Sequence, residues 1–431
     1  MFHQGQATDY IDLLVQLEEL AVNSHVDVIV LNVGGTGWAV GDLFTINGGT
    51  TVGGHAAIGE VLTEAAGVAL TVRIFAGGAY TVSPGVAATT TAILPSVGIN
   101  LTIDATILAT GWATDRSQVL VAPERELLLR GVGSGADEIF IGIETKRNVA
   151  AGVFYWELAG NTGFDNGEAF DTQPGSSRAT LTTEDLTTPF NNGIIDFFVV
   201  IDGFHIKIIG KSGASYTNAY LGFIFTYATP AEYPYPLIII GCSSAATRNQ
   251  PFNSSSNFLS GMHDPLKFAN ADDGPAAIRE VDGQWYQIAH AFAQGASKLK
   301  QSFRVIYPAG SIPNNDTAEF SLIDRFDIYA QADDPSVMFG NASDTAAPAR
   351  TLQPSVDSGG DIAFLWPTML FQKVPSQQFL GELIDVYPVV VFGIGAVAED
   401  TMTDANGDVY LLFQNCNRTD VWTFFAIKRT F

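Results

Sequence analysis

The hydrophobic positions of this chain follow a helical period near the N-terminus. Between Thr8 and Val22, apolar residues recur three and four positions apart and so share one face of a helix: Ile11, Leu14, Val15, Leu17 and Leu20. Thr8 is suited to the N-cap, and the acidic Asp9 and Asp12 in the first turn favour the positive end of the helix dipole. The pattern predicts an amphipathic helix within residues 1–26, whose apolar face needs a partner surface.

The segment 27–108 has the pattern of short strands joined by Gly-rich turns. Residues 68–75 and 101–108 alternate between apolar and polar side chains, which is typical of half-buried strands. Two glycine-rich elements, at 34–37 and 77–78, predict turns. The segment has few charges and much Gly, Ala, Thr and Val, so we expect a compact, separately folded β module over residues 27–108.

Strand signals continue along the rest of the chain. In residues 109–245, apolar segments such as 197–201 are strand-sized and predict one β-sandwich-like domain. Residues 246–273 are rich in Ser, Asn and Pro and are expected to form a loop or linker. Residues 274–431 carry further strand candidates and long loops, which predict a C-terminal β domain. The expected fold class is mainly β, with several β-sandwich-like domains and one short N-terminal amphipathic helix.

Composition narrows the classes of function. Hydrophobic residues make up 47% of the 431 residues and charged residues only 15%, against about a quarter in ordinary soluble domains. Because charged side chains are depleted where partners bury a surface, this shortage predicts a surface with many contacts. The net charge of −24 argues against direct binding of nucleic acid, which needs clustered Lys and Arg.

The chain has no sequence signal for export or for membrane insertion. Residues 1–6 have neither the basic nor the apolar region of a signal peptide. No apolar run approaches the ~20 residues that span a bilayer. We therefore expect a protein that is made in a cytoplasm and has no membrane partner.

Several motifs resemble functional sites, and each has a simpler structural interpretation. Gly34–Gly37 is followed neither by Lys-Ser/Thr nor by a helix, which favours a turn over a phosphate loop. Asp404–Asp408 resembles the opening of a calcium loop, but position twelve is Asn415 and the flanks are strand-like, which favours a hairpin turn. Ser212-Gly213 and Ser358-Gly359 are turn-like and do not form a nucleophile elbow.

The remaining titratable residues also lack a catalytic or metal-binding pattern. Neighbours on an extended segment point to opposite sides, so the doublets Asp272/Asp273 and Asp333/Asp334 do not form carboxylate pairs across a cleft. Cys242 and Cys416 are far apart in sequence and are expected to be buried free thiols. No two histidines have metal-ligand spacing: His3, His25, His55, His205, His263 and His290. We expect no enzyme activity, no catalytic, cofactor-binding or metal-binding residues, and no cofactor.

Several segments, in their order along the chain, resemble a family of tailed-bacteriophage virion structural proteins. They are Gln4–Leu14, Glu126–Gly131, Asp137–Ile143, Tyr155–Gly163, Gln173–Gly175, Ala219–Leu237, Gly381–Leu383 and Arg418–Asp420. In that family the helix runs almost directly into the Gly-Trp segment at Gly111, so residues 27–108 resemble an inserted Gly-rich β module, as exposed loops tolerate. The resemblance implies a protein of the tail or baseplate without catalytic residues.

The resemblance also implies that the mechanism is assembly. Copies of the chain would contact one another and other virion proteins in a closed ring or trimer, so the expected location is the virion. An alternative is a receptor- or carbohydrate-binding module on the tail tip, or a capsid decoration protein, with host surface glycan as a partner. Exposed aromatic residues on the loops at 243–273 and 331–360 would favour that alternative. A depolymerase ranks last, because the sequence has no internal repeats of the β-helix type.

Overall fold

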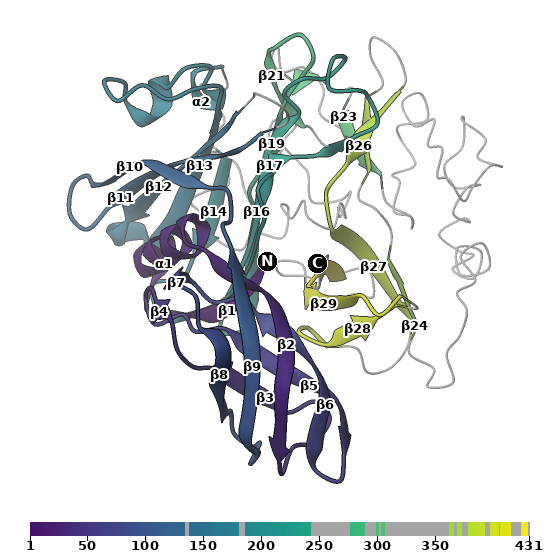
Figure 1. The fold of residues 1–431 in the computed structure, drawn as a ribbon. Coiled ribbons are helices and arrows are strands. Elements are labelled where there is room, and N and C mark those ends of the chain that lie inside the picture. The colour runs from purple at the N-terminus through teal and green to yellow at the C-terminus, as the bar shows by residue number, and fades with distance from the viewer. Residues whose placement is uncertain are drawn as a thin grey trace, which may run out of the picture.

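The structure is a computed structural model of the chain (Figure 1). It describes residues 1–133, 138–180, 186–242, 276–288, 299–300, 303–306, 362–365, 369–372, 378–392, 397–404, 406–414 and 424–429. Within these ranges the chain is mainly β and its strands form several sheets, as expected from the sequence. None of the helices in these ranges is long and apolar enough to cross a membrane.

The N-terminal segment contributes a strand as well as the expected helix: β1 (Phe2–Ala7) and α1 (Tyr10–Val22). The N-cap is Asp9, whose Oδ1 accepts hydrogen bonds from the amides of Ile11 and Asp12, each at 2.8 Å. The predicted cap, Thr8, is wrong because its own amide donates to Asp12 Oδ2 at 2.7 Å, one position before the helix. The buried face of α1 packs on the sandwich core and consists of Tyr10, Leu13, Leu14, Leu17, Leu20 and Ala21.

The middle of the molecule is a sandwich of two sheets with a shared apolar core (Figure 1). The five-stranded sheet runs β10 (Ala113–Val119), β11 (Arg125–Val132), β12 (Glu138–Asn148), β13 (Val153–Asn161) and β14 (Leu186–Phe190). The eight-stranded sheet runs β1, β15 (Ile195–Ile201), β16 (His205–Ser212), β17 (Ser215–Phe223), β19 (Leu237–Ile240), β20 (Ala276–Arg279), β21 (Trp285–Ile288) and β22 (Leu299–Lys300). The connections of the five-stranded sheet contain three short helices: the 3₁₀ helices η1 (Val149–Ala151) and η2 (Phe170–Thr172), and α2 (Ser177–Thr180).

Two expected domain boundaries differ from this arrangement. The segment 1–26 supplies an edge strand of the sandwich, because β1 pairs with β15 through Phe2↔Val200. The strands β20 and β21, which fall in the segment 274–431, also belong to the sandwich, because β20 pairs with β19 through Ile238↔Ile278. A long stretch of sequence separates β20 from β19, so the local pattern does not reveal that these two strands pair.

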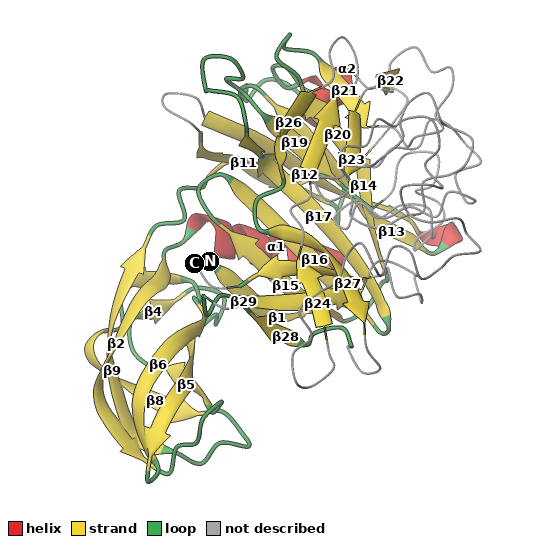
Figure 2. Cartoon of the chain, turned by 90° about the vertical axis from the view of Figure 1, so that its right-hand side faces the viewer, coloured by secondary structure: helices red, strands yellow, loops and turns green. Residues whose placement is uncertain are grey.

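The segment 27–108 forms a β module that projects from one end of the molecule in both views (Figures 1 and 2). Its six-stranded sheet runs β2 (His25–Thr36), β9 (Ile99–Leu108), β8 (Gly85–Ala92), β3 (Leu43–Ile46), β5 (Ile58–Ala65) and β6 (Val68–Ala76). A small sheet pairs β4 (Thr50–Thr51) with β7 (Tyr80–Val82). The module has its own core, with Trp38, Phe44 and Ile103 among its members.

The two edge strands of the module sheet, β2 and β6, approach each other closely. The Trp38 amide donates to the Gly67 carbonyl at 3.0 Å, and a Cβ on Gly34 would lie 2.2 Å from the Ala69 carbonyl oxygen. The sheet therefore curls toward a barrel. The predicted turn at 34–37 is only partly right, because β2 continues to Thr36 and Gly34 allows the close approach of β6.

The C-terminal region packs against the outer face of the eight-stranded sheet through a second apolar core. Its five-stranded sheet runs β24 (Ile362–Leu365), β27 (Val386–Phe392), β30 (Phe424–Lys428), β29 (Val409–Gln414) and β28 (Thr401–Thr403). A four-stranded sheet runs β18 (Phe225–Thr226), β26 (Gln378–Glu382), β25 (Met369–Gln372) and β23 (Phe303–Ile306). The predicted loop 246–273 lies outside the described residues.

Candidate functional site

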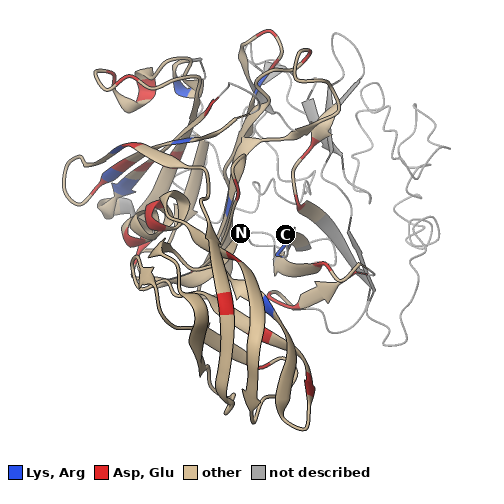
Figure 3. Ribbon diagram, in the orientation of Figure 1, with Lys and Arg blue, Asp and Glu red and all other residues tan. Residues whose placement is uncertain are grey.

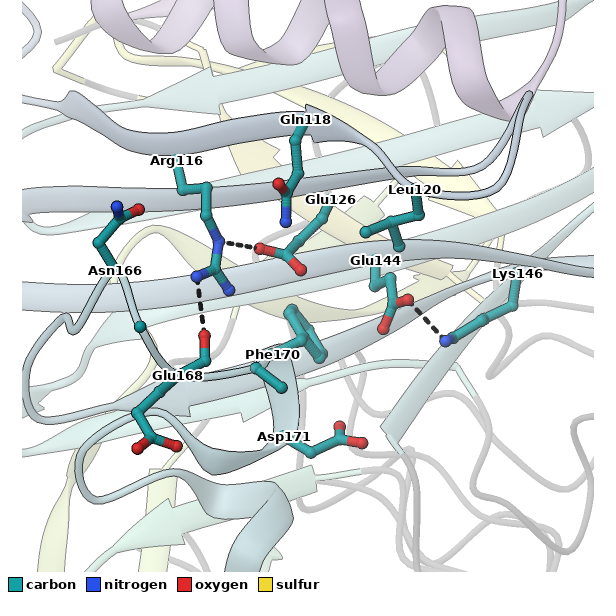
Figure 4. Close-up of a pocket in the computed structure, with 12 residues that line it drawn as sticks. Arg116, Gln118, Leu120, Glu126, Glu144, Lys146, Asn166, Glu168, Phe170 and Asp171 are labelled. Carbon is teal, nitrogen blue, oxygen red and sulfur yellow. Dashed lines mark hydrogen bonds and ion pairs between the residues drawn. The ribbon is translucent and has the colours of Figure 1, made fainter.

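A cavity of about 630 Å³ opens on the outer face of the five-stranded sheet (Figure 4). The segment between β13 and α2 crosses this face and forms one wall of the cavity, while β10, β11 and β12 form its floor. Its lining is mostly polar and charged: Arg116, Gln118, Leu120, Glu126, Glu144, Lys146, Asn166, Gly167, Glu168, Ala169, Phe170 and Asp171.

Three glutamates from neighbouring strands form a row on the sheet face that carries this site, and two of them, Glu126 and Glu144, line the cavity. The strand register places Glu126 opposite Glu144, and Glu144 opposite Glu157. Directly opposite residues on one sheet face have Cβ atoms about 5 Å apart, so the three carboxylates are neighbours. Their exposed fractions are 3%, 7% and 4%, so all three are buried. Like charges at this spacing and burial need nearby cations.

Three cations accompany this glutamate row, which we define as Glu126, Glu144 and Glu157. Arg116 pairs with Glu126 and also donates to the backbone carbonyl of Glu168 at 2.8 Å (Figure 4). Lys146 Nζ lies 2.6 Å from Glu144 Oε1. Arg178 Nη2 lies 3.3 Å from Glu157 Oε2, and Lys146 Nζ lies 3.9 Å from the same oxygen. Each carboxylate of the row therefore has an opposite charge beside it.

Burial and pairing act in opposite directions on the protonation of these groups. Burial raises the pKa of Glu144, while the hydrogen bond and the charge of Lys146 lower it less. Burial disfavours the charged form of Lys146, but the hydrogen bond and charge of Glu144, together with Glu157, leave the pKa of Lys146 raised. Lys146 thus stays protonated at neutral pH and holds its place between two carboxylates.

The wall of the cavity is organised by Gln173, which is 2% exposed. Its side-chain amide donates to the carbonyls of Asp165 and Glu168 at 3.0 and 2.8 Å, and its carbonyl accepts from the Asp165 amide at 2.9 Å. Gly175, two positions later, has φ +60°, and the segment then returns to the sheet. The Gln-Pro-Gly motif of the sequence therefore shapes the wall of this cavity.

The geometry of the glutamate row suits a role in holding the cavity wall on the sheet better than a role in proton transfer. A general acid or base must exchange a proton with a bound molecule, whereas each glutamate of the row is held by a cation. The one aromatic ring in the lining, Phe170, is 4% exposed and offers little surface for stacking. The cavity can accept a polar ligand through Gln118 and Asn166, but the described lining has no nucleophile poised for catalysis.

The residues considered in the sequence have varied outcomes. The turn at Asp404 is confirmed: β28 and β29 pair across it, and Asp404 Oδ1 accepts from the Asn406 and Asp408 amides at 2.8 and 3.0 Å. The turn at Ser212 and Gly213 is confirmed by the β16–β17 hairpin. Cys242 is a buried free thiol, as expected.

Other expectations fall outside the part of the chain that the structure describes: Cys416, His263, His290, Ser358, Asp272/Asp273 and Asp333/Asp334. Of the four described histidines, His205 Nε2 lies 3.0 Å from Asp202 Oδ2 and His55 Nε2 lies 3.7 Å from Glu19 Oε2. In the described residues, no group of three or more His, Cys, Asp or Glu side chains is placed to hold a metal ion.

Sequence reasoning did not identify the glutamate row. It considered adjacent carboxylates on loops, whereas the row is built from single glutamates on three different strands. The available signal is a charged residue inside an apolar strand, as at Glu157 in the segment Tyr-Trp-Glu-Leu. That signal marks a buried partner but does not identify it.

No protein-family model matches this sequence, and no curated protein is similar enough to it to count as a relative.

Proposed function

We propose that this chain is a structural component of a tailed-bacteriophage particle, in the tail or baseplate. It acts through assembly with copies of itself and with other virion proteins, and not through catalysis. The ordered segments that resemble phage virion proteins motivate the proposal. The surface of the β module is the structural observation that supports it best.

The β module exposes an unusual amount of apolar surface. More than half of the exposed large hydrophobic residues in the described chain belong to residues 25–108. Val30 on β2 and Leu70 on β6 are 58% and 53% exposed, and these strands lie side by side at Gly34. The same segment has one basic and five acidic residues, and Figure 3 shows how sparse the charges are there. Apolar, weakly charged and projecting surface is typical of a protein-contact site.

The candidate site on the sandwich is compatible with an assembly role. The glutamate row and its cations tie the 162–180 segment to the five-stranded sheet, which gives the sandwich a fixed outer surface. A rigid surface loses less entropy on assembly than a mobile one.

Immunogold labelling of intact particles tests the proposal, with antibody raised against this chain and the same antibody absorbed with purified protein as control. We expect gold at the tail or baseplate. Gold over the head would replace the tail assignment with capsid decoration. Protein that is free in the lysate, with no labelled particle, would overturn the proposal.

A carbohydrate-binding role is the second candidate, and one surface favours it. Phe225 and Tyr227 are 56% and 48% exposed, and their rings lie 6.2 Å apart at an angle of 75°. Tyr227 Oη donates to Glu382 Oε2 at 3.0 Å. Exposed rings beside a carboxylate suit the apolar face and hydroxyl groups of a sugar. Retention of the protein on host polysaccharide, and its loss in Phe225→Ser, would support this role.

A further inference from the structure

A lysine occupies a position in the sandwich where the pattern requires an apolar residue. Lys207 on β16 lies opposite Val200 on β15 and Tyr220 on β17. Val200 and Tyr220 belong to the apolar core between the eight-stranded sheet and the C-terminal sheet. The side chain of Lys207 is 0% exposed. Fully buried lysines are rare, because burial removes the hydration of the ammonium group.

The Lys207 side chain points to a single carboxylate on the other side of this core. Asp385 Oδ2 lies 3.8 Å from Lys207 Nζ, and Nζ has no hydrogen-bond partner within the described residues. Asp385 lies in the turn before β27 with φ +54°, a left-handed conformation that Gly adopts freely and Asp more readily than most other residues. The Lys428 amide donates to the Asp385 carbonyl at 3.2 Å and fixes this turn.

We propose that Lys207 and Asp385 react with each other to form an intramolecular isopeptide bond, which joins the eight-stranded sheet covalently to the C-terminal sheet. This proposal rests on the burial of Lys207 and on the facing positions of the two side chains, of which Asp385 is 21% exposed, and it is independent of the proposed function.

The reaction is a condensation that needs no other reactant. One proton first passes from the Lys207 ammonium group to the Asp385 carboxylate. The lone pair of the now uncharged Lys207 Nζ attacks Asp385 Cγ, and a C–N bond forms. A C–O bond then breaks. The departing hydroxyl and one of the two amine protons leave together as water, and the other proton remains on the amide nitrogen. Holding the reacting atoms against each other in a folded core replaces the activation that a free acid and amine need.

The charges around the pair support this chemistry. Burial lowers the pKa of Lys207 to about 8, although Asp385 and Asp202 oppose the shift, so roughly a tenth of the amine is uncharged at neutral pH. Burial raises the pKa of Asp202, while Lys207 lowers it less. Asp202 is a second carboxylate in this environment, and its Oδ2 lies 3.0 Å from His205 Nε2. Its Oδ1 accepts from the amides of Phe204 and His205 at 2.7 and 2.9 Å, which holds the carboxyl in place.

A second lysine on the same strand provides a matched control. Lys211 pairs with Glu399, and Tyr216 Oη donates to the same carboxylate oxygen at 2.6 Å. The Lys211 and Glu399 side chains are 27% and 34% exposed, so water solvates this ion pair. Both lysines face the C-terminal region, but only the buried one has the environment that favours condensation.

Mass spectrometry of the full chain tests the proposal. The intact, denatured protein should be lighter than its sequence by one water molecule. Digestion with trypsin should yield residues 179–211 joined to residues 374–418, because an amide at Lys207 blocks cleavage there. Lys207→Met and Asp385→Gly should both show the full mass; glycine accepts the backbone conformation of Asp385 without strain. Lys211→Met should still lack one water.

Two further outcomes decide the matter. A wild-type chain of full mass would overturn the proposal. Loss of water that persists in Lys207→Met would also overturn it, because a succinimide at Asp202-Gly203 gives the same mass. The branched peptide of the wild type is decisive even where a variant does not fold.

Discussion

The glutamate row makes a sharp prediction for Arg178→Ala. Arg178 is 13% exposed and holds Glu157, whose side chain is 6% exposed. Removing one partner of a buried ion pair destabilises a protein by about 3–5 kcal/mol, because the other charge stays buried. Lys146 remains 3.9 Å from the same carboxylate and offsets part of this loss. We therefore expect a loss of about 2–3 kcal/mol in the sandwich.

The measurement must report on the sandwich alone, since a chain with several domains does not unfold in one step. Hydrogen exchange of the β13 amides at increasing urea concentration meets this need. With an m-value of about 2 kcal/mol/M, the midpoint should fall by about 1 M. The control is Glu138→Ala: Glu138 is 49% exposed and pairs with Arg130 at 3.0 Å, while Arg130 keeps its second partner, Asp115, at 3.3 Å, so the loss should stay below about 1 kcal/mol.

A double variant tests the reasoning directly. When Glu157→Gln is added to Arg178→Ala, the buried Glu157 charge that Arg178 balanced is absent. More than half of the lost stability should therefore return. Equal losses for Arg178→Ala and Glu138→Ala, or no recovery in the double variant, would refute the interpretation that the row is buried and charge-balanced.

Three more predictions follow from single residues. Because burial raises the pKa of Glu144, ionisation of this carboxyl weakens the folded state. Glu144→Gln should therefore raise the urea midpoint of unfolding at neutral pH. This gain should vanish as the pH falls toward 4.5, the usual pKa of a glutamate, because the wild-type carboxyl is then protonated in the folded state. Asp9→Ala should destabilise α1 by about 1 kcal/mol, measured by hydrogen exchange of the helix, whereas Asp9→Asn should retain most of the cap. Val30→Glu should leave the circular dichroism spectrum unchanged but reduce incorporation into particles. Val149, outside the module, is 65% exposed against 58% for Val30, and Val149→Glu should not reduce incorporation; equal incorporation of the two variants would exclude the module as the contact surface.

Local pattern was sufficient for elements whose signal lies within a few residues. The periodicity of Leu14, Leu17 and Leu20 predicted α1, and the Asn406-Gly407 dipeptide predicted the β28–β29 hairpin. The strand β1 was missed because its sequence, Phe-His-Gln-Gly-Gln-Ala, is mostly polar. It is a strand because Phe2 and His3 pair with residues nearly 200 positions away.

The candidate site could not be predicted because it depends on register. A shift of one residue between β11 and β12 would send Glu144 to the opposite face from Glu126 and place it in the apolar core. Sequence alone shows single glutamates within apolar strands, and only the pairing of the strands brings them together. The same holds for Lys207, which lies in the eight-stranded sheet, and Asp385, which lies in the turn before β27 of another sheet.

The stability of the double variant Lys207→Met with Asp385→Gly separates two interpretations of the buried lysine. If Lys207 and Asp385 form only an ion pair, replacing both partners should be neutral or stabilising, since burial of the ammonium group opposes folding and no unpaired charge remains. If the two residues are joined, the double variant loses a covalent ring of about 180 residues, which by chain entropy stabilises the fold by about 5 kcal/mol. The two interpretations thus predict opposite signs for one double variant. A lower urea midpoint for β16 hydrogen exchange in this double variant, with no comparable change in Lys211→Met, agrees only with the covalent bond.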